Sequence, residues 1–315
     1  MRLGRGKMFS LADLHCDTAA KLFALDVDLR SEDLHVNLDK LRAHSSALQV
    51  FAVCTEDTER GGARYTRAMR ILSRFFQNLS AYAGAIRLCR SASELSSAMA
   101  SGRAAALLAV EGGGAFDGVY ANIDRFYNLG VRIVTLTWNG ENELACGQPG
   151  HGRLTRFGLE SLRRMHSLGM LPDLSHMCAE SFFDVCSRYD GVFLCSHSNL
   201  AAVCPHERNL ADWQVTELFR RGGVLGLNLY PPFLRSGPAR AADVLPHLEH
   251  ALSLGGEGQI CLGCDFDGVD MLPEDVTGLE SMAALYTLLQ REGYGQALID
   301  GLFFDNALRF FQRFL

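Results

Sequence analysis

Eight short apolar runs recur along this 315-residue chain, and each is followed by a turn and a segment with helical periodicity. Near-continuous runs of this kind are typical of parallel strands that are buried on both faces, with helices covering the sheet. Eight such repeats predict an α/β fold, a (β/α)8 TIM-type barrel, which reaches this length as one domain. The runs are Met8–His15, Ala47–Cys54, Ala104–Glu111, Val131–Trp138, Met170–His176, Val192–His197, Val224–Tyr230 and Ile260–Asp265.

Amphipathic helices are expected between the runs and after the last one. The spacing of Ser91 and Glu94 predicts a capping box at the start of one helix. Residues 279–292 and 296–314 follow the eighth run, and we expect these C-terminal helices to close the barrel. Because no repeat, low-complexity tract or linker interrupts the chain, residues 1–315 are expected to form a single domain. The other helices are expected at Tyr65–Ala83, Ser91–Ala100, Thr155–Leu168, Ala179–Tyr189, Asp212–Arg221 and Ala241–Leu254.

Charge and hydrophobicity exclude two classes of partner. The formal net charge of -6 argues against nucleic acid. No stretch is long and apolar enough to span a bilayer, and the apolar run after Lys7 is too short for a secretory signal. The last ten residues, 306–315, have the pattern of an amphipathic helix rather than of a lipid-attachment signal. We therefore expect a protein with no nucleic-acid or membrane partner. The sequence does not fix the oligomeric state, and a homodimer is one of the states compatible with it.

The ten cysteines lie mostly inside apolar segments, which favours buried free thiols over disulfides. Free thiols are typical of a reducing compartment, so a cytoplasmic location is expected. Cys261 and Cys264 form a lone CxxC pattern on an expected strand. Because positions three apart on a strand face opposite ways, a redox or zinc role for this pair is the weaker interpretation.

Five of the apolar runs end in residues that can bind a metal ion. Barrel enzymes place their chemistry at the carboxyl ends of the strands. Each ending also has a simpler interpretation, because a lone His at a strand end is often structural and a Glu before glycines can cap a helix. Five endings on one rim, however, would concentrate imidazoles and carboxylates that require cations for neutralisation. These residues are His15 and Asp17, Glu111, Asp173 and His176, His197, and Asp265 and Asp267.

The number of these side chains favours two metal ions. His15 and Asp17 supply one ion, His176 and His197 supply the other, and Glu111 bridges them with its two oxygens. Two ions about 3.5–4 Å apart can polarise a carbonyl and generate a hydroxide near neutral pH. Many binuclear barrels use a carboxylated lysine as the bridge, but no lysine of this chain falls at a late strand end, which leaves Glu111 in that role. The lysines are Lys7, Lys21 and Lys40.

The chain resembles the membrane dipeptidase (renal dipeptidase) family of the amidohydrolase superfamily, and the likeness covers nearly the whole sequence in order. The resemblance implies a zinc-dependent dipeptidase that binds two Zn²⁺ per chain and a small peptide substrate, in which a water bridging the metals attacks the peptide carbonyl. The matching motifs are Asp13-Leu-His-Cys-Asp17, Val110-Glu-Gly-Gly113, Gly130-Val-Arg132, Thr135-Leu-Thr137, Gly169-Met170, Asp173-Leu-Ser-His176, Ser196-His-Ser198, His206-Glu-Arg-Asn209 and Gly263-x-Asp-Phe-Asp-Gly268.

The resemblance also implies roles for residues around the metals. Arg208, which would otherwise be interpreted as a surface arginine, grips the substrate carboxylate with its planar fork. Asp265 orients the water or handles its proton, although Asp267 shares the same face and leaves the division of roles open. Tyr230 lies near the substrate. Asp13 is expected to support a ligand imidazole rather than to bind metal itself.

One residue departs from the family pattern. Where the characterised dipeptidases have a His after Thr-Leu-Thr, this chain has Trp138. In the family that His helps to hold the polarised carbonyl oxygen, whereas an indole N–H donates a hydrogen bond but does not titrate. The departure leaves room for a related metal-dependent amide or lactone hydrolase with a substrate other than a dipeptide. A barrel without catalysis that serves as a binding protein is the third alternative.

Overall fold

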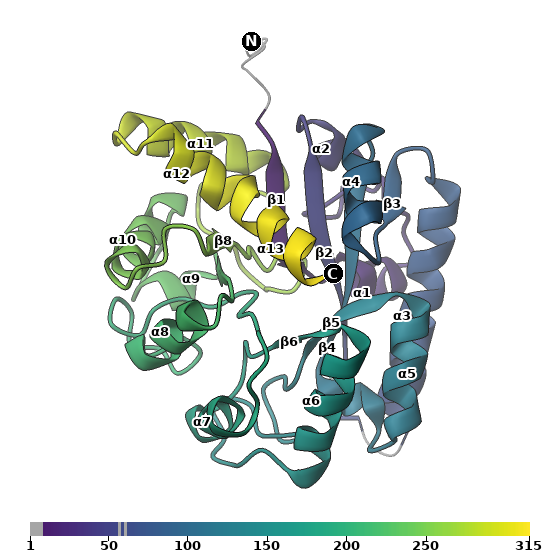
Figure 1. Ribbon diagram of the computed structural model, residues 1–315. Helices are drawn as coiled ribbons and strands as arrows, with labels where there is room; N and C mark the ends of the chain where they lie inside the picture. The colour runs from purple at the N-terminus through teal and green to yellow at the C-terminus, as the bar shows by residue number, and fades with distance from the viewer. Residues whose placement is uncertain (1–8, 56–57, 60–61) are drawn as a thin grey trace.

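The computed structural model describes residues 9–55, 58–59 and 62–315, and it shows a curled parallel sheet with helices on its outside (Figure 1). This confirms the predicted TIM-type barrel. Seven of the eight predicted runs contain a strand. The strands are β1 (Leu11–Cys16), β2 (Ala47–Cys54), β3 (Ile86–Leu88), β4 (Ala104–Glu111), β5 (Val131–Thr135), β6 (Leu171–Asp173), β7 (Leu225–Leu227) and β8 (Ile260–Leu262).

The order of the strands in the sheet is β6-β5-β4-β2-β1-β8-β7, and all the pairs are parallel. The sixth predicted run, Val192–His197, fills the place between β6 and β7 but forms only isolated bridges, Asp173↔Leu194 and Cys195↔Leu225. The prediction of a full strand there is therefore wrong, although the ring position is correct. Strand β3 was not predicted, because Arg87 interrupts its apolar pattern, and it pairs with the start of β4.

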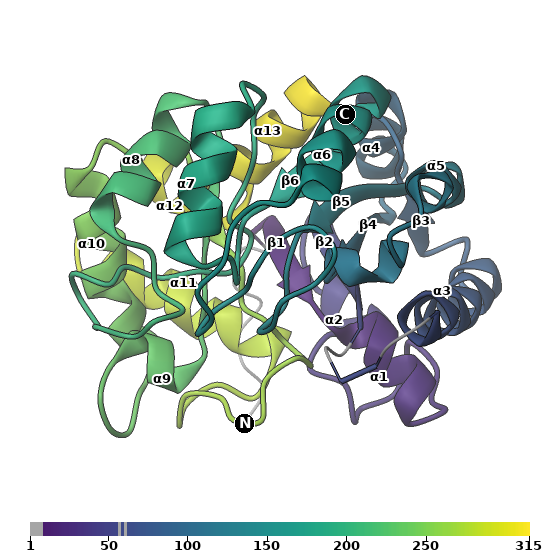
Figure 2. The same cartoon turned by 90° about the horizontal axis from the view of Figure 1, so that it is seen from below.

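Helices connect the strands and cover the outside of the ring (Figure 2). Ser91 caps α4 by accepting from the backbone N–H of Glu94, as the sequence predicts. Helices α1, α2, α5 and α9 were not predicted from the sequence. The bounds are α1 (Thr18–Ala24), α2 (Leu38–Arg42), α3 (Ala63–Ala81), α4 (Ala92–Ala100), α5 (Tyr120–Leu129), α6 (Arg156–Leu168), α7 (Ala179–Arg188), α8 (Asp212–Arg220), α9 (Pro231–Leu234), α10 (Leu245–Ser253), α11 (Met282–Arg291), α12 (Gln296–Asp300) and α13 (Asn306–Phe314).

The interior of the ring is filled by side chains from alternate strand positions. On β4, Ala105, Leu107 and Ala109 belong to this interior cluster, so Glu111 at the end of the strand shares their face. Phe310 and Phe311 of α13 join the same cluster, which confirms a C-terminal closing helix. Figure 1 shows this helix crossing in front of β1 and β2.

Strand β1 contains a β-bulge that changes which residues face inward. Asp13 pairs with Gln49 and Cys16 pairs with Phe51, so three steps along β1 oppose two steps along β2. The extra residue breaks the simple alternation of faces along the strand. The direction of the His15 side chain therefore does not follow from counting two residues on from Asp13.

All ten cysteines lie in the described part of the chain, and all are free, which confirms the expectation of unpaired thiols. Among the described residues, no helix combines the length and the apolar character that crossing a membrane requires.

Candidate metal centre and its cavity

The five residues predicted to bind metal lie together at the carboxyl end of the strand ring. They form two buried groups that share Glu111: one with His15 and Asp17, the other with His176 and His197. Glu111 Oε2 lies 3.5 Å from His15 Nε2, and Glu111 Oε1 lies 3.0 Å from His176 Nε2. Each oxygen of this carboxylate therefore faces a different group, an arrangement that suits a bridging ligand.

The group on the β1 side contains buried polar atoms without hydrogen bonds. His15 Nε2 and Asp17 Oδ1 have no hydrogen-bond partner among the described residues, although His15 Nε2 lies 3.5 Å from Asp17 Oδ2. Burial, together with the charge of Glu111, raises the pKa of Asp17 to about 7. A buried polar atom left unpaired is costly, and a cation satisfies several at once. The donor set of imidazole and carboxylate fits a zinc ion.

The group on the other side presents two imidazole lone pairs to the same space. His176 Nδ1 donates to Asn139 Oδ1 at 2.8 Å. Ser196 Oγ donates to Asp173 Oδ2 at 2.6 Å and so accepts from His197 Nδ1 at 2.7 Å. Both Nε2 atoms are then unprotonated and only 2.7 Å apart. Lone pairs this close repel each other unless a cation lies near them, so this pair also fits a metal ion.

The local environment favours the neutral, metal-binding form of both imidazoles. Burial lowers the pKa of His197 well below its usual value, and burial also lowers the pKa of His176. Neutral imidazole is the form that binds a metal.

Gly268 leaves space for the carboxylates of the cluster. A Cβ added at this position would lie 2.1 Å from Asp17 Oδ2 and 2.6 Å from Asp265 Oδ1.

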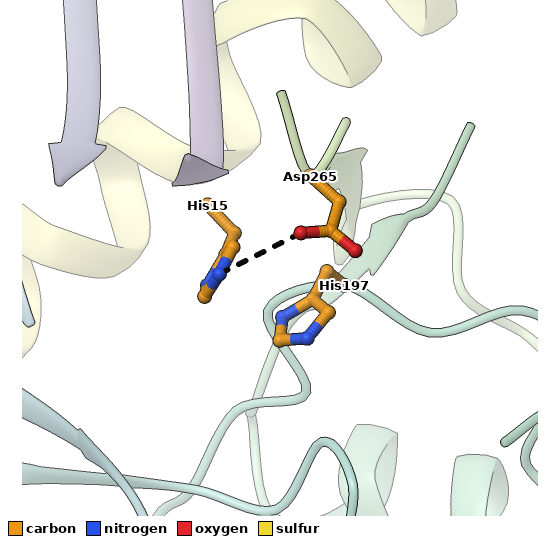
Figure 3. Close-up of side chains that lie close together, drawn as sticks. All are labelled: His15, His197 and Asp265. Atoms are coloured by element: carbon orange, nitrogen blue, oxygen red, sulfur yellow. Dashed lines mark ion pairs between the residues drawn. The ribbon is translucent and has the colours of Figure 1, made fainter. Parts of the chain in front are cut away.

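Asp265 and Asp267 have different surroundings, although both follow β8. Asp265 Oδ1 lies 3.8 Å from His15 Nε2, with His197 beside it (Figure 3), and Oδ2 accepts from Asn228 Nδ2 at 3.1 Å. Asp267 instead accepts from Thr18 Oγ1 at 2.6 Å and from the backbone N–H of His35 at 2.8 Å. The carboxylate of Asp267 is thus occupied by α1 and the 35–36 loop.

Three non-glycine residues at the rim adopt left-handed backbone conformations. The φ angles are 70° at His176, 61° at Asp265 and 67° at Asp267. Asp and His tolerate this region better than most residues, but it still costs free energy. Such residues cluster at functional sites, and here His176 belongs to a candidate metal group and Asp265 lies beside His15.

The cluster lies at the base of a cavity of about 860 Å³ whose walls include the predicted substrate residues Trp138, Arg208 and Tyr230. Arg208 is buried, and its Nη2 has no hydrogen-bond partner among the described residues. Burial lowers the pKa of Arg208 to about 10, which leaves it charged at neutral pH. A buried guanidinium with an unused donor at a cavity suits a carboxylate ligand. The indole of Trp138 lies beside His176, with 6.4 Å between the ring centroids.

Some residues that support the site were not predicted. Asp173 was noted only as a strand ending, yet it accepts hydrogen bonds from Thr135 and Ser196 side chains and from two backbone amides. Asn139 and Asn228 orient His176 and Asp265, and nothing in their spacing signals these contacts.

Asp13 corrects a prediction. It accepts from the backbone N–H of Cys264 at 2.8 Å and of His15 at 3.4 Å, rather than from an imidazole. Burial raises the pKa of Asp13 to about 6. Its carboxylate therefore ties β1 to the residues after β8 through backbone groups.

Comparison with known proteins identifies the family. Residues 6–314 match the membrane dipeptidase family, peptidase family M19. This chain belongs to that family. Dipeptidases are hydrolases, so membership confirms both the resemblance found in the sequence and the predicted class of enzyme.

Two relatives illustrate how far the membrane dipeptidase likeness extends. An uncharacterized protein in the pqqA 5′ region of Klebsiella pneumoniae is 33% identical over 240 residues, which are 72% of this chain and 88% of that protein. An uncharacterized dipeptidase of Schizosaccharomyces pombe is 33% identical over 226 residues, which are 67% of this chain but only 53% of that protein. The chain thus spans about half the length of the yeast relative.

A solved structure supports the fold. A metallo peptidase from Rhodobacter sphaeroides, liganded with a phosphinate mimic of the dipeptide L-Ala-D-Ala, has a TM-score of 0.91 and 23% identity over 98% of this chain and 100% of that chain. At this level of identity the likeness shows the fold alone.

Proposed function

We propose that this member of the membrane dipeptidase family is a binuclear zinc enzyme that hydrolyses the peptide bond of dipeptides. The observation that carries the proposal is Glu111, whose two oxygens face two separate groups of buried ligands. We assign His15 and Asp17 to one zinc ion, His176 and His197 to the other, and Glu111 to both. When bound, the two ions would polarise the scissile carbonyl and lower the pKa of a water molecule towards neutrality.

The side chains of the cavity bind the dipeptide and transfer the proton of the attacking water. Arg208 holds the α-carboxylate through its unused guanidinium donor, and Tyr230 borders the bound substrate. Asp265 accepts the proton from the attacking water and returns it to the leaving amine. Asn228 supports this role, because its bond to Oδ2 keeps Oδ1 directed towards His15. The carboxylate of Asp267 is held by Thr18 and the 35–36 loop, which favours Asp265 over Asp267.

A second enzyme function keeps the metals and changes the substrate bond. Trp138 carries this alternative, because an indole beside His176 narrows the cavity and does not titrate. A related amide or lactone hydrolase would then act on a compact substrate. Turnover of lactones or simple amides by the zinc-loaded protein, with none on any dipeptide, would favour this alternative.

We also propose that residues 1–315 act as one catalytic domain and that the enzyme works in the cytoplasm. The ten free cysteines support that location, since free thiols persist in a reducing compartment.

The test is a library of dipeptides, with L- and D-residues at the second position, assayed with zinc-loaded protein. We expect chelator-sensitive turnover and poor activity on C-terminally amidated dipeptides. Arg208→Met removes the guanidinium but keeps much of the apolar stem. It should lower kcat/KM by about 30- to 5,000-fold, the range for losing one partner of a buried charge pair.

Arg235→Met is the matched control, because Arg235 is 55% exposed, pairs with Asp243 and does not line the cavity. It should leave kcat/KM near the parent value. Equal activity of Arg208→Met and parent, or equal rates on free and amidated dipeptides, would contradict the assignment.

A further inference from the structure

One face of helix α1 forms a wall of the cavity and carries a single long side chain. Asp17, Ala20, Lys21 and Ala24 line the cavity, and their spacing of three, four and seven residues places them on one side of the helix. The two alanines leave space beside them. Lys21 therefore extends along a wall that is otherwise built from small side chains.

Among the described residues, the ammonium of Lys21 forms neither a hydrogen bond nor an ion pair, although carboxylates such as Asp267 and Asp270 line the same cavity. Two other cationic side chains, Lys40 and Arg67, form ion pairs. Lys40 Nζ lies 3.0 Å from Glu280 and donates to Leu34 O at 2.9 Å. Arg67, which also lines the cavity, lies 3.6 Å from Glu59. Lys21 is thus available to an anion that enters the cavity.

Lys21 is close to the metal groups but across the ring from Arg208. It follows Asp17 by one helical turn, about 6 Å along the axis. In the ring, β1 and β2 lie opposite the 192–197 segment that leads to Arg208. Figure 2 shows α1 and α3 on the other side of the ring from α8 and α9. A dipeptide whose α-carboxylate binds Arg208 and whose carbonyl lies at the metals therefore extends its N-terminal residue towards α1.

Resting on the dipeptidase function proposed above, we propose that Lys21, with Ala20 and Ala24, forms a subsite for an acidic side chain on the N-terminal residue of the substrate. The preferred substrates are then dipeptides that begin with Glu or Asp. A lysine in the last turn also complements the helix dipole, but that effect alone changes stability and not the choice between substrates.

The experiment compares kcat/KM for Glu-Ala and Gln-Ala, which differ in charge but hardly in shape. The parent should prefer Glu-Ala by about tenfold, the scale of one charge-assisted hydrogen bond. Lys21→Met should bring the ratio close to one, Lys21→Arg should retain it, and Lys21→Glu should shift preference towards Lys-Ala. Arg42→Met, which removes an exposed cation outside the cavity, should keep the parent ratio.

A second pair of substrates, Ala-Glu and Ala-Gln, tests the position of the subsite. Their ratio should not respond to Lys21→Met, because the second side chain lies on the Arg208 side. A parent that does not distinguish Glu-Ala from Gln-Ala would overturn the proposal. So would a Lys21→Met variant that loses the same factor on every dipeptide.

Binding separates failure of this inference from failure of the proposed function. Non-hydrolysable phosphinate isosteres of Glu-Ala and Gln-Ala can be titrated calorimetrically into zinc-loaded parent and Lys21→Met. If no dipeptide is hydrolysed, the dipeptidase function fails, yet tighter binding of the Glu isostere that is lost in Lys21→Met would still support the subsite. Equal affinities for both isosteres in the parent would overturn it.

Discussion

The two halves of the barrel position their parts of the cluster in different ways. In the first half, β2 and β4 pair continuously from Leu48↔Ala105 to Cys54↔Glu111, so the backbone ladder places Glu111. In the second half, β6, β7 and β8 have three residues each, and the 192–197 segment joins them only through isolated bridges. Side-chain hydrogen bonds position the candidate ligands there. For example, Ser196 bonds both Asp173 and His197.

The difference is also seen in the backbone at the cluster itself. Glu111 ends a regular strand in the first half, whereas His176 and Asp265 in the second half have positive φ angles. A ladder positions a ligand with many equivalent bonds, so single substitutions around it have small effects. Where only a few polar side chains position a ligand, replacing any one of them has a large effect. Four sets of substitutions test this contrast.

The largest effect is expected at Glu111, whose two oxygens face ligand groups from both halves. Glu111→Gln should abolish turnover and lower the affinity for both ions by more than about 100-fold, the upper range for residues that only support a ligand. The physical reason is that a carboxamide offers one neutral oxygen where two charged ones face His15 and His176. Elemental analysis of metal-loaded protein measures the loss. A stoichiometry that never exceeds one ion per chain in the parent, unchanged in Glu111→Gln, would rule out the bridge.

The second-largest effect is expected at Asp265, and Asp267 on the same loop is the comparison. Asp265→Asn should lower kcat by about 10²–10⁴-fold with metal content retained, because a positioned proton acceptor is lost. Asp267→Asn is the control and should mainly lower Tm, since its carboxylate binds Thr18 and the 35–36 loop. Steady-state kinetics and thermal unfolding measure the pair. Near-normal turnover in Asp265→Asn would move the proton-handling role elsewhere.

A smaller effect is expected from a residue that acts through His197. Ser196→Ala removes the hydroxyl that accepts from His197 Nδ1 and should weaken zinc binding in the second half by about 10- to 100-fold. Ser198→Ala is matched to it, because Ser198 bonds Ser175 and not an imidazole. Competition with a chelator of known affinity compares the two variants. If both retain parental affinity, side-chain positioning in this half is not what holds the ion.

The smallest effect concerns the cavity wall rather than the ligands. Trp138→Phe should lower dipeptide hydrolysis modestly, by losing the indole N–H, and Trp138→His should raise or broaden it. Metal content should not change in either variant, because Trp138 only borders His176. A dipeptide library measures both. Parental profiles in both variants would mean that Trp138 does not contact the substrate.

Much of the fold could be predicted because long apolar runs are an unambiguous signal. All seven strands that lie in predicted runs begin within three residues of their predicted starts. In the second half the predicted runs are longer than the strands, because β6, β7 and β8 have only three residues each. Val192–His197 has the same apolar character as its neighbours, yet it pairs too irregularly to form a strand.

The candidate ligands could be predicted from the sequence, but their supports could not. His15, Glu111 and His197 follow apolar runs, and such positions meet at one rim of a barrel. Asn139 and Asn228 lie in loops, where any of many polar residues could have been the partner. Asp13 was misassigned, because a β-bulge leaves no mark in the pattern of residue types.

The sequence by itself determined the barrel, the residue types at its rim and the family, because these depend on apolar periodicity and on motifs that are local in the chain. Only the tertiary structure decided that Asp265 and not Asp267 faces His15, that Asp13 accepts from backbone amides, and that Lys21 lines the cavity. Each of these depends on the direction of a side chain relative to a segment distant in sequence. That direction is set by ring closure and by loop conformation, which no local pattern records.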